Sequence, residues 1–148
     1  MLYKCVCAVW VVIAIAFSIT PVSAQESLGE KKIWREQEDY LAGEGKDMKE
    51  RCGKDIPGSF DKASYKGQLE GSYSVYGYCA ELYSALRSIC SDPDGKTAVQ
   101  AKVNKITCAY GGKDKRALSL SGGTLKMMID WDASNYGDFI NAWLLKNL

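Results

Sequence analysis

The spacing of apolar residues predicts a long helix over residues 30–52. Its apolar positions fall on one arc at 3.6 residues per turn. They are Ile33, Trp34, Tyr40, Leu41, Met48 and Cys52. Gly43 and Gly45 disfavour the middle of this helix, so two shorter segments are the alternative. Gly53 is well placed to end the helix, because glycine adopts the left-handed conformation of a C-cap at little cost.

A second amphipathic helix is predicted over residues 72–90. Its apolar stripe consists of Val75, Tyr76, Cys79, Leu82, Tyr83, Leu86, Ile89 and Cys90. Polar side chains occupy the opposite face, which is typical of a helix packed on a core. Segment 54–71 is rich in glycine and predicts a long loop, and residues 91–95 predict a turn that ends the helix. A short third helix is predicted over residues 97–102.

Beyond residue 105 the period changes to two, which predicts β-strands. Apolar residues alternate with polar or small ones in three segments, over residues 106–110, 118–120 and 125–131. Glycine pairs at 111–112 and 122–123 supply the turns between these segments. The pattern predicts a three-stranded antiparallel meander with one apolar face.

A C-terminal helix is predicted after Ser134 or Asn135, since either side chain can serve as an N-cap. The chain then comprises two long N-terminal helices, the meander and a C-terminal helix. Helices packed on one face of a small antiparallel sheet make an α+β fold.

The first two dozen residues carry the pattern of a secretory signal peptide. A single basic residue, Lys4, precedes an almost unbroken apolar run over residues 6–19, and three small residues follow at 22–24. A run of about 14 residues is short for a bilayer span. We expect residues 1–24 to be cleaved, which leaves residues 25–148 as a single secreted or periplasmic domain.

Charge in the mature domain is balanced, because cleavage removes only Lys4 from a chain with 19 basic and 18 acidic residues. Equal numbers of basic and acidic residues give no electrostatic reason to expect nucleic acid or an anionic membrane as partner. No second long apolar run follows the signal, so no integral membrane span is expected after cleavage.

Four cysteines remain in the mature chain, and an even number in a small exported domain predicts two disulfides. They are Cys52, Cys79, Cys90 and Cys108. Cys79–Cys90 is excluded, because helical residues eleven apart lie about 16 Å apart. The favoured pairing is Cys52–Cys79 with Cys90–Cys108, since Cys52 ends one predicted helix and Cys79 lies near the start of the next. Cys52–Cys90 with Cys79–Cys108 is the alternative.

Catalytic signatures are sparse. The chain has no histidine, which removes the commonest general base and the usual zinc ligand sets, so no metal or cofactor is expected. Ser59 and Lys62 match Ser-x-x-Lys, but the companion motifs of penicillin-binding enzymes are missing. Paired carboxylates for sugar hydrolysis remain an alternative, although sequence alone selects no pair.

Oxygen-bearing side chains cluster where the last strand meets the last helix. They are Asp130, Asp132, Asn135 and Asp138. Such spacing can hold calcium, but it departs from the EF-hand pattern. Helix capping explains the same residues, so calcium binding is left open.

Aromatic residues outside the helical and strand stripes are candidate binding anchors. They are Phe60, Tyr65, Tyr73 and Tyr78. Exposed aromatic rings often anchor protein contacts. The sequence therefore favours an exported binding protein without catalytic activity, engaging an envelope component or an enzyme that it inhibits. The alternatives are a hydrolase of cell-wall sugar, a structural envelope protein, and a carrier of a small apolar ligand.

Overall fold

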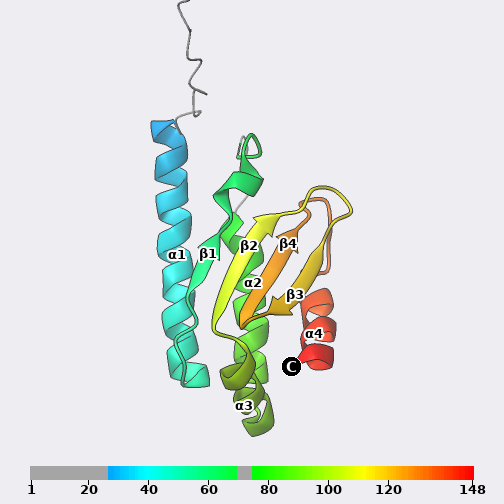
Figure 1. Cartoon of the computed structure of the whole chain (residues 1–148). Coiled ribbons are helices and arrows are strands. Elements are labelled where there is room, and N and C mark those ends of the chain that lie inside the picture. Colours follow the sequence, from blue (N-terminus) through cyan, green and yellow to red (C-terminus); the bar gives the residue numbers. More distant parts are fainter. Residues whose placement is uncertain (1–26, 70–74) are drawn as a thin grey trace, which may run out of the picture.

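A computed structural model describes residues 27–69 and 75–148. Its elements, in chain order, are α1 (Leu28–Cys52), β1 (Gly58–Phe60), the 3-10 helix η1 (Lys62–Tyr65), α2 (Val75–Ile89), α3 (Pro93–Lys102), β2 (Lys105–Tyr110), β3 (Ala117–Ser121), β4 (Thr124–Ile129) and α4 (Tyr136–Asn147) (Figure 1). The predicted signal peptide, residues 1–24, and the predicted helix start at Ser72 lie outside the described residues. Helices and a mixed sheet in one chain confirm the α+β class.

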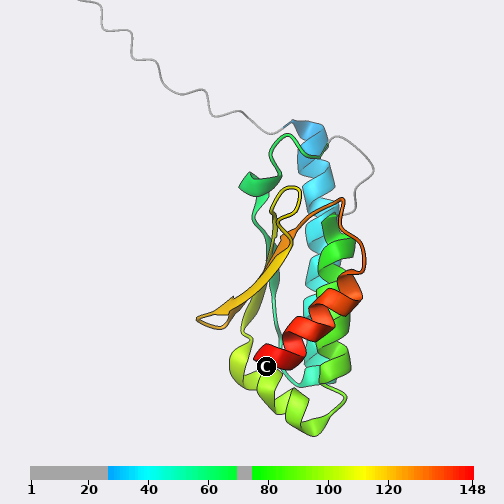
Figure 2. The ribbon, with the colours of Figure 1, turned by 90° about the vertical axis from the view of Figure 1, so that its right-hand side faces the viewer.

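The molecule has two layers, a four-stranded sheet and the helices α1, α2 and α4 on one side of it (Figure 2). Alternate strand residues point toward the helices and are buried, as expected for a sheet with one apolar face. These inward residues include Phe60, Ile106, Cys108, Leu118, Leu125, Met127 and Ile129. Among the helices of the described residues, none combines the length and apolar character that a bilayer crossing requires.

The sheet is not the predicted meander. Its strand order is β1-β2-β4-β3, with β2 parallel to both β1 and β4, and only β3 and β4 are antiparallel. The hairpin at Gly122 and Gly123 is confirmed, and both residues have the positive φ that such a turn requires. The predicted meander placed β2 directly beside β3, whereas β4 lies between them. β4 has three buried inward side chains and no fully exposed residue, and it lies inside the sheet. β3 has exposed residues at alternate positions and lies at the edge of the sheet.

Helix α1 is continuous, so the alternative of two segments is wrong. Ser27 and Glu30 form a reciprocal capping box at its start, and Gly53 ends it with φ 74°, as predicted. Gly45 serves packing: a Cβ there would lie 3.1 Å from the backbone oxygen of Ile56, so the missing side chain lets the returning chain pass close to the helix.

Segment 54–71 contains a strand and a 3-10 turn, where the sequence predicted only a loop. β1 carries the chain back along α1, and α2 then runs in the same direction as α1 (Figure 1). Contacts between the helices follow this parallel course. The backbone amide of Tyr76 at the start of α2 donates a hydrogen bond to the side-chain oxygen of Gln37, and Arg87 near the end of α2 pairs with Glu44.

The parallel course of α1 and α2 decides the disulfides. Cys52 and Cys90 lie at the same end of the two helices and are bonded, with Cα atoms 5.2 Å apart. Cys79 is bonded to Cys108 on β2, with Cα atoms 6.3 Å apart. The favoured pairing was therefore wrong and the alternative is the one observed. The favoured pairing placed the start of α2 near the end of α1, whereas the C-terminal ends of the two helices lie together.

Helix α3 begins at Pro93, four residues before its predicted start. Asp92, assigned to a turn, is the N-cap and accepts a 2.8 Å hydrogen bond from the Gly95 amide, while Pro93 takes the first helical position. The predicted C-terminal helix is confirmed as α4. Asn135 occupies its N-cap position, but the Asn135 side chain forms no capping hydrogen bond, so the predicted side-chain cap is wrong.

Candidate functional site

The predicted aromatic anchors do not form an exposed surface. Tyr65 is fully buried and Phe60 is 8% exposed, so the expectation that these two rings are accessible is wrong. Both pack on Trp34, with ring centroids 5.4 and 5.5 Å apart. Tyr78 is half-buried against the Tyr136 ring. Tyr73 lies outside the described residues.

Tyr65 has an unusual environment for a polar side chain. Its hydroxyl is buried and has no hydrogen-bond partner among the described groups. Burial raises the pKa of this hydroxyl above its usual range, and the nearby Asp61 carboxylate adds to the shift. A phenol held so firmly in its neutral form is suited to packing rather than to proton transfer at neutral pH.

Ser59 and Lys62 have separate partners. The Ser59 hydroxyl lies 3.3 Å from that of Thr107, whereas the Lys62 amino group pairs with Glu38 at 2.7 Å. The two side chains therefore show none of the mutual activation that the Ser-x-x-Lys motif would need.

The acidic cluster near the last helix is used for local structure. Asp130 is buried, and its carboxylate accepts hydrogen bonds from the amides of Asp114 at 2.8 Å and Asp132 at 3.0 Å. Within the described ranges, no three acidic or cysteine side chains gather closely enough to hold a metal ion.

A charged hollow lies between α1 and α2. Its lining residues are Asp47, Glu50, Arg51 and Arg87. Arg87 is paired with Glu44, which also accepts a 2.6 Å hydrogen bond from the Tyr76 hydroxyl. That hydrogen bond, together with partial burial, raises the pKa of Tyr76 to about 12. The lining of the hollow thus combines two carboxylates with two guanidinium groups.

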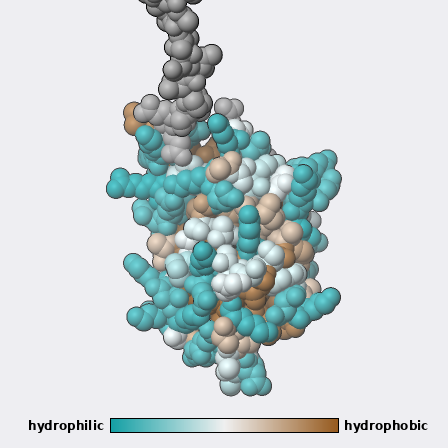
Figure 3. Space-filling model, in the orientation of Figure 1, coloured by the Kyte–Doolittle hydropathy of each residue, from teal (hydrophilic) through white to brown (hydrophobic). Residues whose placement is uncertain are grey.

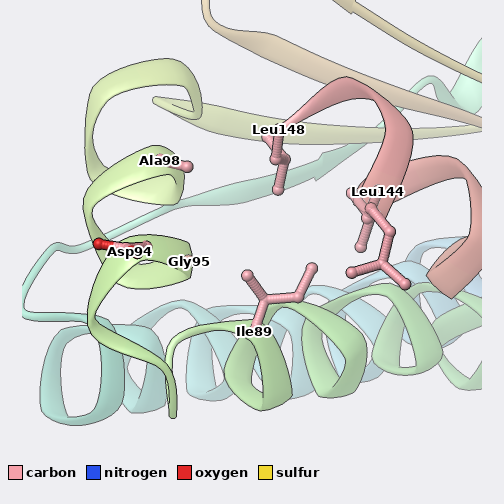
Figure 4. A pocket seen from close by; sticks show the side chains of 7 residues that line it. Ile89, Asp94, Gly95, Ala98, Leu144 and Leu148 are labelled. Atoms are coloured by element: carbon pink, nitrogen blue, oxygen red, sulfur yellow. The ribbon is translucent and has the colours of Figure 1, made fainter.

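An apolar hollow of about 260 Å³ lies where α2, α3 and the end of α4 meet (Figure 4). Ile89, Leu144 and Leu148 supply most of its apolar side chains, and Gly95 and Ala98 form its α3 wall. The adjacent Leu145 is 79% exposed. This hollow is a binding candidate that the sequence pattern did not indicate.

A further candidate surface is the face of the sheet that points away from α1, α2 and α4 (Figure 2). One row of side chains crosses all four strands in register: Ser59, Thr107, Lys126 and Ser119. A second row has Lys105, Thr124 and Ser121. A third has Ala109, Met128 and Ala117, of which Ala109 is buried at 1% exposure. We call these ten residues the open face. Figure 3 looks onto it and shows pale residues of intermediate hydropathy near the centre with hydrophilic side chains around them.

The open face is unusual for the strand pairing beneath it. Parallel strands normally lie in sheets with both faces covered by other elements. Here β1, β2 and β4 are parallel neighbours, yet the long helices α1, α2 and α4 lie on the other side (Figure 2). The strand sequences agree in part, since hydroxyl and lysine side chains in β2 and β4 alternate with buried ones, whereas Ala109 on the same face is itself buried. Alternation was visible in the sequence, but strand order was needed to bring the rows together.

Comparison of the chain with protein-family models, curated proteins and solved structures gives no significant match. A role for it must therefore be inferred from its own residues and their geometry.

Proposed function

We propose that this chain is a small exported binding protein, stabilised by two disulfides, that engages another protein through the open face and has no catalytic activity. The observation that carries the proposal is the uncovered face of a largely parallel sheet. Export is proposed from the N-terminal pattern, and the two disulfides agree with an oxidising compartment.

The side chains of the open face suit contact with a protein. Serine, threonine and alanine lose little rotamer freedom on burial, so covering them carries a small entropic cost. Their hydroxyls can both donate and accept hydrogen bonds. Ser59, Thr107 and Ser119 place such groups across three of the four strands.

The area of the open face limits how much of the contact with a partner it can supply. Four strands of three to six residues, about 4.8 Å apart, give a face of roughly 300 Å². A stable protein interface buries about 800 Å² on each partner. The partner must therefore also contact neighbouring parts, and the loop 111–116 between β2 and β3 is adjacent to the face.

The chemistry of the open face supports binding over catalysis. Its titratable side chains are Lys105 and Lys126, with Asp61 3.8 Å from the amino group of Lys126. The Ser59 hydroxyl contacts the Thr107 hydroxyl instead of a general base. No described group therefore activates these hydroxyls as nucleophiles.

Blocking the face with a bulky neutral side chain tests the proposal. Thr107→Tyr places a ring at the centre of the first row while keeping a residue favoured in strands. Lys31→Tyr, on the exposed surface of α1, is the matched control. Each purified variant is used to capture partners from envelope extract, with cross-linking and mass spectrometry, and thermal melts check folding.

We expect T107Y to lose the protein captured by wild type and K31Y to retain it. Equal capture by both variants would reject the open face. Hydrolysis of cell-wall polymer by the purified protein, lost on substitution of Asp47 or Glu50, would reject the binding class and favour the hydrolase alternative.

A further inference from the structure

We infer that the partner presents an acidic protein surface to the open face. This inference rests on the proposed function and specifies the chemistry of the partner. It starts from the distribution of charge, because the whole chain carries a formal net charge of only +1. Residues 101–129, which run from the end of α3 through the three longer strands, have one acidic residue, Asp114, against six basic ones. The basic residues are Lys102, Lys105, Lys113, Lys115, Arg116 and Lys126.

Two of these basic residues are held on the helix side. Lys102 donates to the terminal carbonyl groups of Asn147 and Leu148. The guanidinium group of Arg116 lies 4.3 Å from the ring centroid of Phe139 and donates to the carbonyl oxygen of Ser134. Both are therefore committed to packing α4 in place.

The other four remain available to a partner. Lys105, Lys113 and Lys115 are exposed and have no ion-pair partner within the described residues. Lys126 lies 3.8 Å from Asp61, and both side chains are 41% exposed. An exposed ion pair of this kind is weak, so Asp61 does not prevent Lys126 from meeting another carboxylate.

The first row adds neutral donors to this positive charge. Lys126 lies in register between Thr107 and Ser119, so an incoming carboxylate can accept from an ammonium group and a neighbouring hydroxyl. The ten residues of the face include no aromatic ring, which single-stranded nucleic acid normally uses for base stacking. Lysines spaced along strands, beside hydroxyl groups, fit the scattered carboxylates of an acidic protein surface.

Titration with an acidic polypeptide tests this chemistry directly. The processed wild-type protein is titrated with poly-L-glutamate and, in parallel, with heparin as a sulfated polysaccharide. Measurements at about 10 mM and about 150 mM salt change the Debye length from about 30 Å to about 8 Å. The variant pair is Lys105→Glu with Lys126→Glu, and the matched control is Lys46→Glu with Lys49→Glu on the exposed surface of α1.

We expect poly-L-glutamate to bind at low salt and to weaken at high salt. The double reversal on the face should weaken binding at least about tenfold, equivalent to about 1.4 kcal/mol, whereas the α1 control should change it much less. Absence of poly-L-glutamate binding, equal loss in the control, or tighter binding of heparin would overturn the inference.

Capture of the natural partner separates this inference from the proposed function. If T107Y loses the partner while the Lys105 and Lys126 reversal retains it at both salt concentrations, the acidic chemistry is wrong and the binding face stands. If neither variant changes capture, the proposed function itself fails.

Discussion

At the scale of single residues, burial decides which aromatic side chains are available for binding. Phe60 lies in β1 with its ring directed inward, and Tyr65 folds back from the 3-10 turn onto Trp34. The sequence could not indicate this, because neither residue belongs to a run long enough to show a period. Residues in long periodic segments were placed correctly: Val75, Leu82 and Leu86 are buried along α2 as predicted.

Tyr65→Phe should leave stability unchanged or raise it by up to about 1 kcal/mol. The reason is that a buried hydroxyl without a partner costs desolvation energy and gains no hydrogen bond. Tyr83→Phe is the control, because the Tyr83 hydroxyl donates to the carbonyl of Ile56 at 3.0 Å and its loss should cost about 1 kcal/mol. Urea unfolding measures both, and a clear loss in Y65F would show that its hydroxyl has a partner after all.

Alkaline pH should destabilise the fold through these same tyrosines. Burial raises the pKa of Tyr65 and of Tyr83 in the folded state, whereas both ionise near pH 10 when unfolded. The stabilising contribution is therefore complete below pH 10 and is lost as pH rises above it, by at most about 1.4 kcal/mol per pH unit for each group. Urea unfolding between pH 8 and about 11 should show this fall, with a shallower slope in Y83F; a flat profile would contradict it.

At the scale of elements, periodicity located helices and strands but did not give their partners. Helices α1, α2 and α4 and strands β2, β3 and β4 lie close to their predicted ranges. Each helix has several turns of apolar periodicity, and each strand has apolar residues that alternate with polar or small ones. The direction of α2 relative to α1 depends on β1, a strand of three residues that is too short to show alternation. Because β1 was predicted as loop, the favoured disulfide pairing was wrong and the parallel pairing of β1, β2 and β4 was not predicted.

The close approach of α1 to the chain leading into β1 can be tested with two glycines. Gly43→Ala should stabilise the protein by about 0.5–1 kcal/mol, since alanine favours the helix and its Cβ meets nothing within 4 Å. Gly45→Ala should lose that gain or destabilise, because its Cβ would meet the Ile56 carbonyl oxygen at 3.1 Å. Thermal melts compare the two, and equal stabilisation by both would contradict the packing described for α1.

At the scale of the whole molecule, the fold is asymmetric. The apolar residues of helices and strands meet in one core, and the other side of the sheet carries rows of small polar residues and lysines. Composition alone did not reveal this surface, because the total charge is close to neutral and the basic residues are separated along the chain. Strand order β1-β2-β4-β3 places Thr107 beside Lys126, although nineteen positions separate them in sequence.

Differential labelling of lysine amino groups tests most directly whether the open face is the binding surface. The protein is acetylated alone and in complex with its captured partner, and mass spectrometry compares each site. Lys105 and Lys126 should become protected several-fold in the complex, while Lys46 and Lys49 on α1 should label equally in both states. Unchanged labelling of Lys105 and Lys126, with protection appearing at Lys46 and Lys49, would contradict the assignment of the open face.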